Sequence, residues 1–321
     1  MEWCNLMCRR CYYYEYMTGK NSKNTQTGQA IVSIAQKVAA HNKQFNQPTD
    51  SCLHGGEPGL LGLKALREIV DELHKIGSTV SMVTNLAFTK LNDPWLELLR
   101  TIDNLGISLN GDFQGNSNRI FRNGKPSFGL VTRNIRALQE TRTTNYGIIC
   151  TVTKENVSSG QATVKFLHQL SSDVKILPMD CPDFPPEELA TFLIDALTAF
   201  IEIDDENFRL SSVDEGLRVL DNQDPVSCVL GRKFKCHHQV TIKLNGDVLP
   251  CDSSHELYQV AGNVFEQSLT EILIGAKWQD LMQQFRRQKK APFCCAATRG
   301  VYSNAWQKYL EVLGKTLQSI Q

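Results

Sequence analysis

Three cysteines stand close together at the start of this chain. Cys4, Cys8 and Cys11 occur in the sequence CNLMCRRC, so three residues and then two separate them. This spacing allows three thiolates to meet at one small centre from a single loop. Thiolates are the usual ligands of iron–sulfur clusters, and three of them leave one iron of a [4Fe–4S] cube open to an outside molecule. A zinc loop is the alternative, although zinc sites usually combine two cysteine pairs.

Composition narrows the possible partners and the compartment. The chain has 321 residues with 34 Lys+Arg and 34 Asp+Glu, and this zero net charge does not favour nucleic acid or an anionic membrane as a partner. We see no apolar run of about 18 residues that would span a bilayer and no secretory leader. Eleven cysteines in such a chain indicate metal or redox chemistry in a reducing cytoplasm, not disulfides.

Helical patterns alternate with short β-rich runs from about residue 26 onward, which predicts right-handed βαβ units and a parallel sheet. The expected strands are Asp50–His54, Thr79–Thr84, Leu105–Leu109, Tyr146–Thr153 and Val174–Met179. The expected helices are Ala30–Phe45, Leu63–Lys75, Pro94–Ile102, Phe128–Glu140, Val164–Leu170 and Glu187–Ile201. Together they predict an α/β fold, with a partial parallel (β/α)6 barrel over residues 1–205. The first strand of such a barrel would precede Cys4, so we expect a truncated chain, a misplaced start or a very short first strand.

Residues 206–321 are expected to form a small cysteine-rich extension. Asn245-Gly246 lies between two β-rich runs, His238–Leu244 and Asp247–Pro250, and predicts a hairpin with a type I′ turn. Ser268–Arg286 and Asn304–Leu317 are expected to be helices. Within the barrel, Cys52 and Cys150 are expected to belong to the core.

CxxxCxxC at the mouth of a parallel α/β barrel resembles the radical SAM superfamily, and the resemblance covers the chain from Cys4 to about residue 200. It implies that the three cysteines hold a [4Fe–4S] cluster and that the amino and carboxylate groups of S-adenosylmethionine (SAM) occupy the fourth iron. An electron from the cluster would then break the sulfonium bond and leave a 5′-deoxyadenosyl radical. The cofactors would supply this chemistry, while the protein aims it and excludes water.

The same resemblance places cofactor contacts at the ends of the strands. The implied residues are Gly55, Gly56, Glu57, Pro58, Thr84, Asn85, Ser108, Asn110, Arg122 and Tyr12. Glu57 would face the methionine amine. Asn110 stands where the superfamily commonly has Asp, so it keeps an acceptor but loses the charge. Arg122 matches an arginine that pairs with the methionine carboxylate in peptide-modifying relatives, with Arg119 as the competing candidate.

A second cysteine set resembles the SPASM and twitch extensions. Cys236, nine residues, Gly246, four residues and Cys251 match the hairpin that carries two thiolates to an auxiliary cluster. The resemblance implies one auxiliary [4Fe–4S] cluster, or a structural zinc as the alternative, held by Cys228, Cys236, Cys251 and Cys294 or Cys295. Cys181, or whichever of Cys294 and Cys295 is left over, would be a candidate hydrogen-atom donor to a substrate radical.

The function expected from this resemblance is maturation of a ribosomally made peptide. CYYYE resembles the CYxYE of peptide-modifying members, including cyclophane-forming maturases. The radical would abstract a hydrogen from an unactivated carbon of a precursor peptide and lead to a carbon–carbon crosslink. Oxidation of a Cys or Ser in a partner protein, as in anaerobic sulfatase maturation, and epimerisation or dehydrogenation of a sugar or aminocyclitol remain open. A zinc-holding interaction module is the non-enzymatic alternative.

The partners follow from the same hypothesis. The expected partners are the precursor peptide, a reducing electron donor such as flavodoxin or ferredoxin, and a separate leader-recognition protein. The last is expected because no leader-recognition domain fits in front of Cys4.

Overall fold

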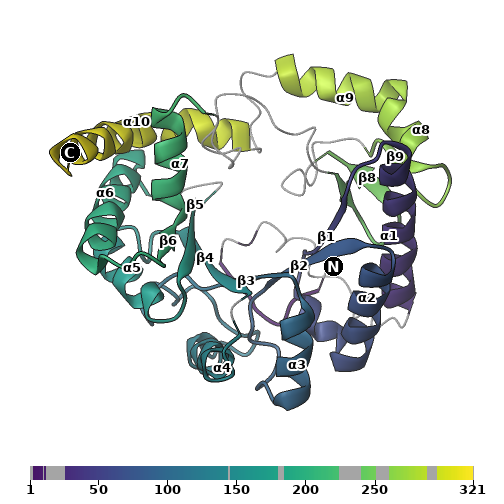
Figure 1. Cartoon of the computed structure of the whole chain (residues 1–321), viewed down its shortest axis with the longest axis horizontal. Coiled ribbons are helices and arrows are strands. Elements are labelled where there is room, and N and C mark those ends of the chain that lie inside the picture. Colours follow the sequence, from purple (N-terminus) through teal and green to yellow (C-terminus); the bar gives the residue numbers. More distant parts are fainter. Residues whose placement is uncertain are drawn as a thin grey trace.

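Six parallel strands form the central sheet in their chain order, β1-β2-β3-β4-β5-β6. The computed structural model describes residues 3–9, 11, 26–143, 145–179, 184–223, 240–250, 260–287 and 295–320. The strands are β1 (Thr49–Leu53), β2 (Ser78–Thr84), β3 (Asn104–Ser108), β4 (Tyr146–Val152), β5 (Asp173–Pro178) and β6 (Arg209–Leu210). The sheet curves into an arc with helices along its convex side (Figure 1). This is the predicted partial barrel.

The outer helices follow the strands in alternation. They are α1 (Gln26–Gln44), α2 (Leu63–Lys75), α3 (Asp93–Thr101), α4 (Phe128–Glu140), α5 (Gly160–His168) and α6 (Pro186–Ile203), and a short 3₁₀ helix, η1, spans Pro58–Leu61. In α2 the buried residues are Leu66, Ile69, Val70 and Leu73, a helical spacing that places one apolar stripe against the sheet. The periodic pattern thus explains why α2 and α4 begin and end at the predicted residues.

Each strand divides its side chains between the helix layer and the concave side of the arc. In β2, Val80 and Met82 are completely buried, whereas Thr79, the residue before Val80, is exposed. Full burial of one such aliphatic side chain contributes about 1.5–3 kcal/mol. Cys150 is buried as expected, but Cys52 is exposed and its assignment to the core was wrong. Its neighbour in the strand, Leu53, takes the buried position, so the alternation leaves Cys52 on the other side.

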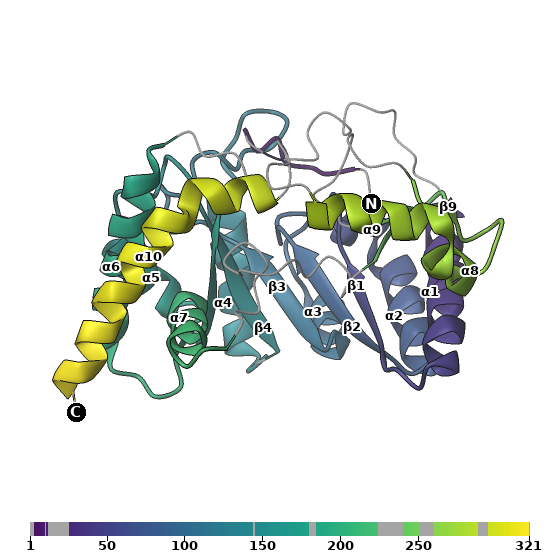
Figure 2. The same ribbon diagram turned by 90° about the horizontal axis from the view of Figure 1, so that it is seen from above.

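The C-terminal elements pack against both ends of the arc (Figure 2). They comprise α7 (Ser211–Leu220), a small antiparallel sheet of β7 (Thr241–Ile242), β8 (Asp247–Leu249) and β9 (Gly262–Asn263), then α8 (Leu269–Ile274), α9 (Ala276–Arg287) and α10 (Cys295–Ile320). A second core, which includes Val248 and Trp278, packs on Ile34 and Val38 of α1. At the other end α10 lies on α6 and α7, where the Tyr309 hydroxyl donates to the carbonyl of Ser212 at 2.9 Å.

Three local features differ from the sequence expectation. The β7–β8 hairpin has four residues, 243–246, between its strands and not a type I′ turn. The Gly246 N–H donates to the Lys243 carbonyl at 2.9 Å, and of these residues Gly246 alone has a positive φ, 89°. The helix expected over Ser268–Arg286 is broken at Gly275, whose backbone is extended. Neither β6 nor α7 was foreseen, and both lie past residue 205.

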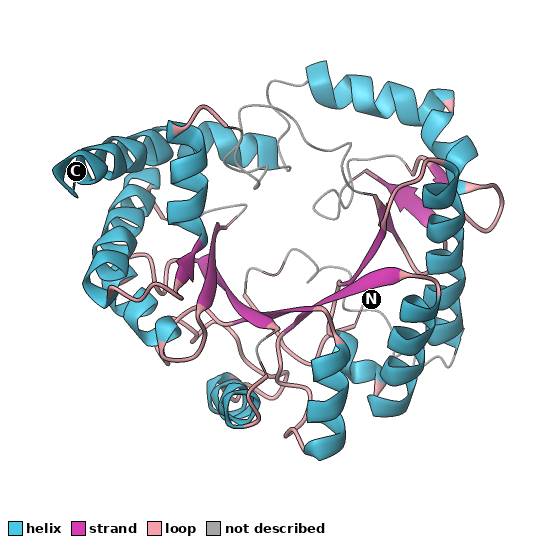
Figure 3. Cartoon of the chain, viewed as in Figure 1, coloured by secondary structure: helices cyan, strands magenta, loops and turns pink. Residues whose placement is uncertain are grey.

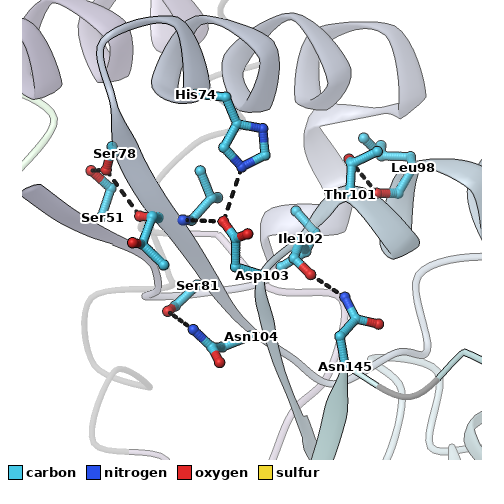
Figure 4. A network of polar contacts seen from close by, with 12 residues as sticks. Ser51, His74, Ser78, Ser81, Leu98, Thr101, Ile102, Asp103, Asn104 and Asn145 are labelled. Atoms are coloured by element: carbon cyan, nitrogen blue, oxygen red, sulfur yellow. Dashed lines mark hydrogen bonds and ion pairs between the residues drawn. The ribbon is translucent and has the colours of Figure 1, made fainter.

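Figure 3 shows the curved sheet of strands lined by helices, and a polar network holds the amino ends of these strands (Figure 4). Asp103 Oδ2 accepts from the backbone N–H of Val80 at 2.8 Å and lies 3.0 Å from His74 Nε2. Both hydrogen bonds hold the pKa of Asp103 below its usual value. Asn145 Nδ2 donates to the carbonyl of Leu99 at 3.2 Å. These contacts join neighbouring strands and helices at the edge opposite the strands' carboxyl ends. In the described part of the chain, no helix is long and apolar enough to cross a bilayer.

Candidate iron–sulfur and cofactor site

The cysteine loop, residues 3–9 with Cys11, lies beside the segment that follows β3. Leu6 forms an antiparallel bridge with Phe121, and the Met7 N–H donates to the carbonyl of Ile120 at 2.7 Å. Leu6 is 1% exposed and belongs to the main core. A turn between Cys8 and Cys11, closed by a 3.2 Å backbone hydrogen bond, then brings these cysteines near each other. The loop is therefore anchored to the barrel by its own backbone.

The thiol of Cys4 is half-buried and close to other charged groups. Burial raises the pKa of its thiol to about 11, and the charges of Glu57, Cys8 and Cys11 add to this rise. Two N–H groups lie near its sulfur, each 3.5 Å from Sγ: the backbone N–H of Leu6 and the side-chain amide of Asn85. Because cysteine ligates metal as the thiolate, metal binding at this site would release the proton of Cys4.

The three sulfurs do not form a single-ion cage. Among the described residues, no three His, Cys, Asp or Glu side chains are grouped tightly enough to hold one metal ion. A cube does not require such a cage, because each thiolate binds a different iron. The thiolate donors, their shared loop and their mutual electrostatic influence therefore suit a cluster.

The turn after β1 touches the cysteine loop directly. The Glu57 N–H donates to the carbonyl of Trp3 at 2.8 Å. A Cβ built on Gly56 would lie 1.9 Å from that same carbonyl oxygen, which is far inside contact distance. Gly55 has a φ of 116°, a region that favours glycine. Both glycines therefore serve the close approach of two backbones, and Pro58 then begins η1.

The Glu57 carboxylate points into the protein and is 0% exposed. Its Oε1 accepts from the Gly59 N–H at 2.9 Å and from the Thr84 hydroxyl at 2.7 Å, and its Oε2 accepts from the Asn85 N–H at 2.6 Å. Burial raises its pKa to about 7, although these hydrogen bonds and the charge of Arg119 lower it. Glu57 thus joins the turn after β1 to the end of β2, and its contact with a methionine amine stays a prediction.

Buried asparagines organise the carboxyl ends of β3 and β4. Asn110, 3% exposed, accepts from the Thr151 N–H at 3.1 Å through Oδ1. Asn156 donates to the carbonyls of Asn110, at 2.7 Å, and Thr151, at 3.0 Å. Ser108 is half-buried at the last position of β3. No sequence pattern indicates the role of Asn156, because its partners are 5 and 46 residues away.

Four buried polar atoms, three in the segment before the Leu6–Phe121 bridge and one directly after β4, have no hydrogen-bond partner within the described residues. They are Asn116 Nδ2, Asn118 Oδ1, Arg119 Nε and Thr153 Oγ1. Leaving such a group unpaired costs about 1–3 kcal/mol, so a bound water or a polar ligand would be stabilised there. The set contains donors and acceptors, which fits a molecule that carries a carboxylate and hydroxyl groups. We call residues 116–119 with Thr153 the polar shelf.

The two arginine candidates differ in their surroundings. Arg122 is exposed, and its Nε donates to the carbonyl of Cys4 at 3.1 Å. Arg119 is half-buried, lies near enough to Glu57 to lower its pKa, and carries one of the unpaired nitrogens.

The structure brings Cys4, Cys8, Cys11, the Gly55–Pro58 turn, Thr84, Asn85 and Arg122 together around one loop. The remaining candidates Tyr12, Cys181, Cys228, Cys236, Cys251 and Cys294 lie outside the described residues, and Cys295 begins α10 with its side chain outside them. Sequence reasoning missed Asn5, whose Nδ2 donates to the carbonyl of Ala87 at 2.9 Å. Its place inside CNLMC is the one signal that would have found it.

Comparison with known families finds two cluster-binding domains. Residues 1–127 match the 4Fe-4S single cluster domain, and residues 234–297 match the SPASM iron-sulfur cluster-binding domain. The serine-type anaerobic sulfatase-maturating enzyme of Bacteroides thetaiotaomicron is 23% identical over 301 residues, which cover 84% of this chain and 72% of that protein.

Solved structures show the same fold at low identity. Native anSMEcpe with bound AdoMet and Cp18Cys peptide has a TM-score of 0.79 at 18% identity, covering 100% of this chain and 97% of that one. Streptococcus suis SuiB bound to S-adenosylmethionine has a TM-score of 0.65 at 15% identity, covering 89% of this chain and 66% of that one. The predicted fold class is therefore confirmed.

Proposed function

We propose that this chain, a radical SAM protein with a SPASM domain, modifies a peptide or protein substrate. The observation that carries the proposal is the cysteine loop, which is anchored between the glycine turn and the polar shelf. When bound, a [4Fe–4S] cluster and SAM supply a 5′-deoxyadenosyl radical that removes a hydrogen atom from an unactivated carbon. An auxiliary [4Fe–4S] cluster in the SPASM domain would accept the surplus electron.

Different residues of this chain would hold the cluster and SAM. Cys4, Cys8 and Cys11 hold three irons and leave the fourth for SAM. Arg119 holds the methionine carboxylate, because its unpaired buried nitrogen has no partner among the described residues. Arg122, the arginine first expected in that task, stays the alternative, and its Nε also supports the loop through the Cys4 carbonyl.

The substrate would enter the concave side of the arc. The exposed positions of β1, β2 and β5 include Cys52, Thr79 and Lys175. Thr79 and Lys175 have buried residues on both sides, and Cys52 has buried Leu53 on one side. Val174 and Ile176, for example, are 0% and 5% exposed beside Lys175. A polar, solvated concave face suits an extended peptide, whose backbone needs hydrogen-bonding partners. Two similar proteins are recorded with peptides, anSMEcpe with Cp18Cys and SuiB with its precursor peptide SuiA.

The proposal for the bond formed is a carbon–carbon crosslink in a ribosomal precursor peptide. Oxidation of a Ser or Cys in a partner protein is the second candidate. It is favoured by the near-complete coverage of anSMEcpe, 97%, against 66% for SuiB. A flavodoxin or ferredoxin would supply the electron, and a separate protein would recognise the leader.

The test begins with anaerobic reconstitution of the whole chain. Two cubes predict about eight irons per chain, with matching acid-labile sulfide. Reduced protein should cleave SAM to methionine and 5′-deoxyadenosine, and the C8A variant should not. Material that binds zinc in place of iron, or that never cleaves SAM, would contradict the proposal.

Peptide products then separate the two candidates. A candidate precursor peptide and a Cys- or Ser-containing sulfatase-type peptide are incubated separately with the reconstituted protein. A crosslink gives a peptide that has lost two hydrogens and resists hydrazide capture, whereas oxidation of Ser or Cys gives a carbonyl that hydrazide captures. Fragmentation by mass spectrometry places the change.

A further inference from the structure

We propose that Asn85 tunes the reduction potential of the first cluster by donating an amide hydrogen bond to the sulfur of Cys4. The inference deepens the proposed function and rests on it, because it needs the cluster bound. Asn85 Nδ2 lies 3.5 Å from Cys4 Sγ and 2.9 Å from Asn5 Oδ1. The backbone N–H of Leu6 lies at the same 3.5 Å distance from the sulfur. Asn85 thus adds a side-chain donor to one that the loop itself provides.

The direction of the amide follows from its partners. Asn85 Oδ1 accepts from the Ala87 N–H at 2.7 Å, so the carbonyl side of the amide faces a donor. The Asn5 amide is fixed in turn, because its Nδ2 donates to the Ala87 carbonyl at 2.9 Å. Rotating the Asn85 amide by half a turn would place two oxygens against each other and leave the Ala87 N–H facing an NH₂ group. The nitrogen therefore faces the sulfur.

The backbone is bent to keep this amide in place. Leu86 has a φ of 51° although it carries a side chain, and it is 0% exposed. This left-handed conformation is unfavourable for a residue with a Cβ and persists only where neighbours hold it. The Thr84 hydroxyl accepts from the Leu86 N–H at 2.9 Å, and Asn134 donates to the Leu86 carbonyl at 2.9 Å. The bend is what brings the Ala87 N–H to Asn85.

A donor aimed at a cluster sulfur stabilises the reduced cluster. The reduced state carries one more negative charge, and hydrogen bonds to the sulfurs are among the levers that set cluster potentials. Asn85 is 6% exposed, so solvent screens its dipole weakly. Its removal makes the cluster harder to reduce, and reduction is the step that SAM cleavage requires.

The test compares three substitutions in the reconstituted whole chain. N85D keeps the size and the acceptor for Ala87 but loses the donor. N85L loses the donor without adding a charge. N104D is the matched control, because exposed Asn104 lies at the amino end of β3, where its amide contacts the Ser81 hydroxyl at 3.4 Å. Anaerobic potentiometric titration followed by electron paramagnetic resonance measures each potential. The first cluster is recognised by its spectral change with SAM, and the auxiliary cluster is an internal reference.

N85L should lower the reduced fraction of the first cluster at a fixed potential roughly three- to tenfold, the range expected for one hydrogen bond. A tenfold change corresponds to about 59 mV for a one-electron couple. N85D should lower it further, while N104D and the auxiliary cluster should stay unchanged. An unshifted N85L, or an equal shift in N104D and N85D, overturns the inference.

A fourth variant, N5A, covers the case in which the Asn85 variants fail to retain iron. N5A removes the acceptor that holds the Asn85 amide and should shift the potential in the same direction by less. An unshifted potential in N5A then overturns the inference. The failure of the proposed function looks different, because wild-type protein would show no SAM-sensitive cluster at all.

Discussion

Replacing Gly56 with alanine should displace the cysteine loop and leave the barrel folded. The new Cβ would lie 1.9 Å from the Trp3 carbonyl oxygen, whereas real Cβ contacts stay above 3.0 Å, so about 1.1 Å of movement is required. The contact is with backbone on both sides, which leaves no flexible side chain to yield. Overpacking of this kind costs about 1–3 kcal/mol. The backbone hydrogen bond from Glu57 to Trp3, worth about 1 kcal/mol, would be strained as well.

Trp3 adjoins Cys4, so the movement reaches a cluster ligand. A misplacement of about 1 Å in a reacting group can cost about 100-fold in rate. We therefore expect G56A to cleave SAM roughly 100-fold more slowly and to retain less iron after gel filtration, while circular dichroism shows an intact barrel. G129A is the matched control, because a Cβ there meets nothing within 4 Å in helix α4. Wild-type iron content and rate in G56A would refute the reasoning.

The remaining predictions concern charge. Burial raises the pKa of Glu57 from 4.5 to about 7, so the folded state holds this proton more tightly than the unfolded state between these pH values. The free energy of unfolding should therefore fall as pH rises from about 4.5 to 7, by about 3 kcal/mol at most. Urea unfolding at pH 5 and pH 8 measures this, and an equal pH dependence in E57Q would contradict it. R119Q should weaken SAM binding roughly 10- to 100-fold in equilibrium dialysis, the loss expected for a hydrogen bond to a charged group. R122Q should weaken it less and release iron more readily, and the reverse order would contradict the assignment.

The sequence pattern predicted those helices and strands that bury one regularly spaced apolar face. Helix α2 has apolar residues on one stripe, and its bounds matched. In contrast, β6 has only two residues, too few for any alternation to show. Helix α7 contains Gly216, which argues against a helix in sequence, yet a Cβ there would lie 2.4 Å from Leu313 in α10. The glycine is present because two helices approach closely, and that requirement appears only in the folded chain.

The residues of the candidate site also differ in whether a sequence motif reveals them. The three cysteines and the glycine turn could be singled out because each is a short motif with a fixed spacing, and the structure places the two motifs in contact. The inward direction of Glu57 was not found, because its donors come from Thr84 and Asn85, about 27 residues along the chain. Asn5 and Asn134 were missed for the same reason, since a single asparagine carries no pattern and its role depends on which backbone groups face it.

The bridge between Leu6 and Phe121 makes the cysteine loop and the polar shelf neighbours on one short stretch of chain, because residues 116–119 immediately precede the bridging segment. We expect two ligands held by one such unit to stabilise each other, and the factor is then the same in both directions. Occupation of the shelf then slows the escape of iron, and a lost cube loosens whatever the shelf carries. The enzyme would protect its most oxygen-sensitive part whenever its cosubstrate is abundant.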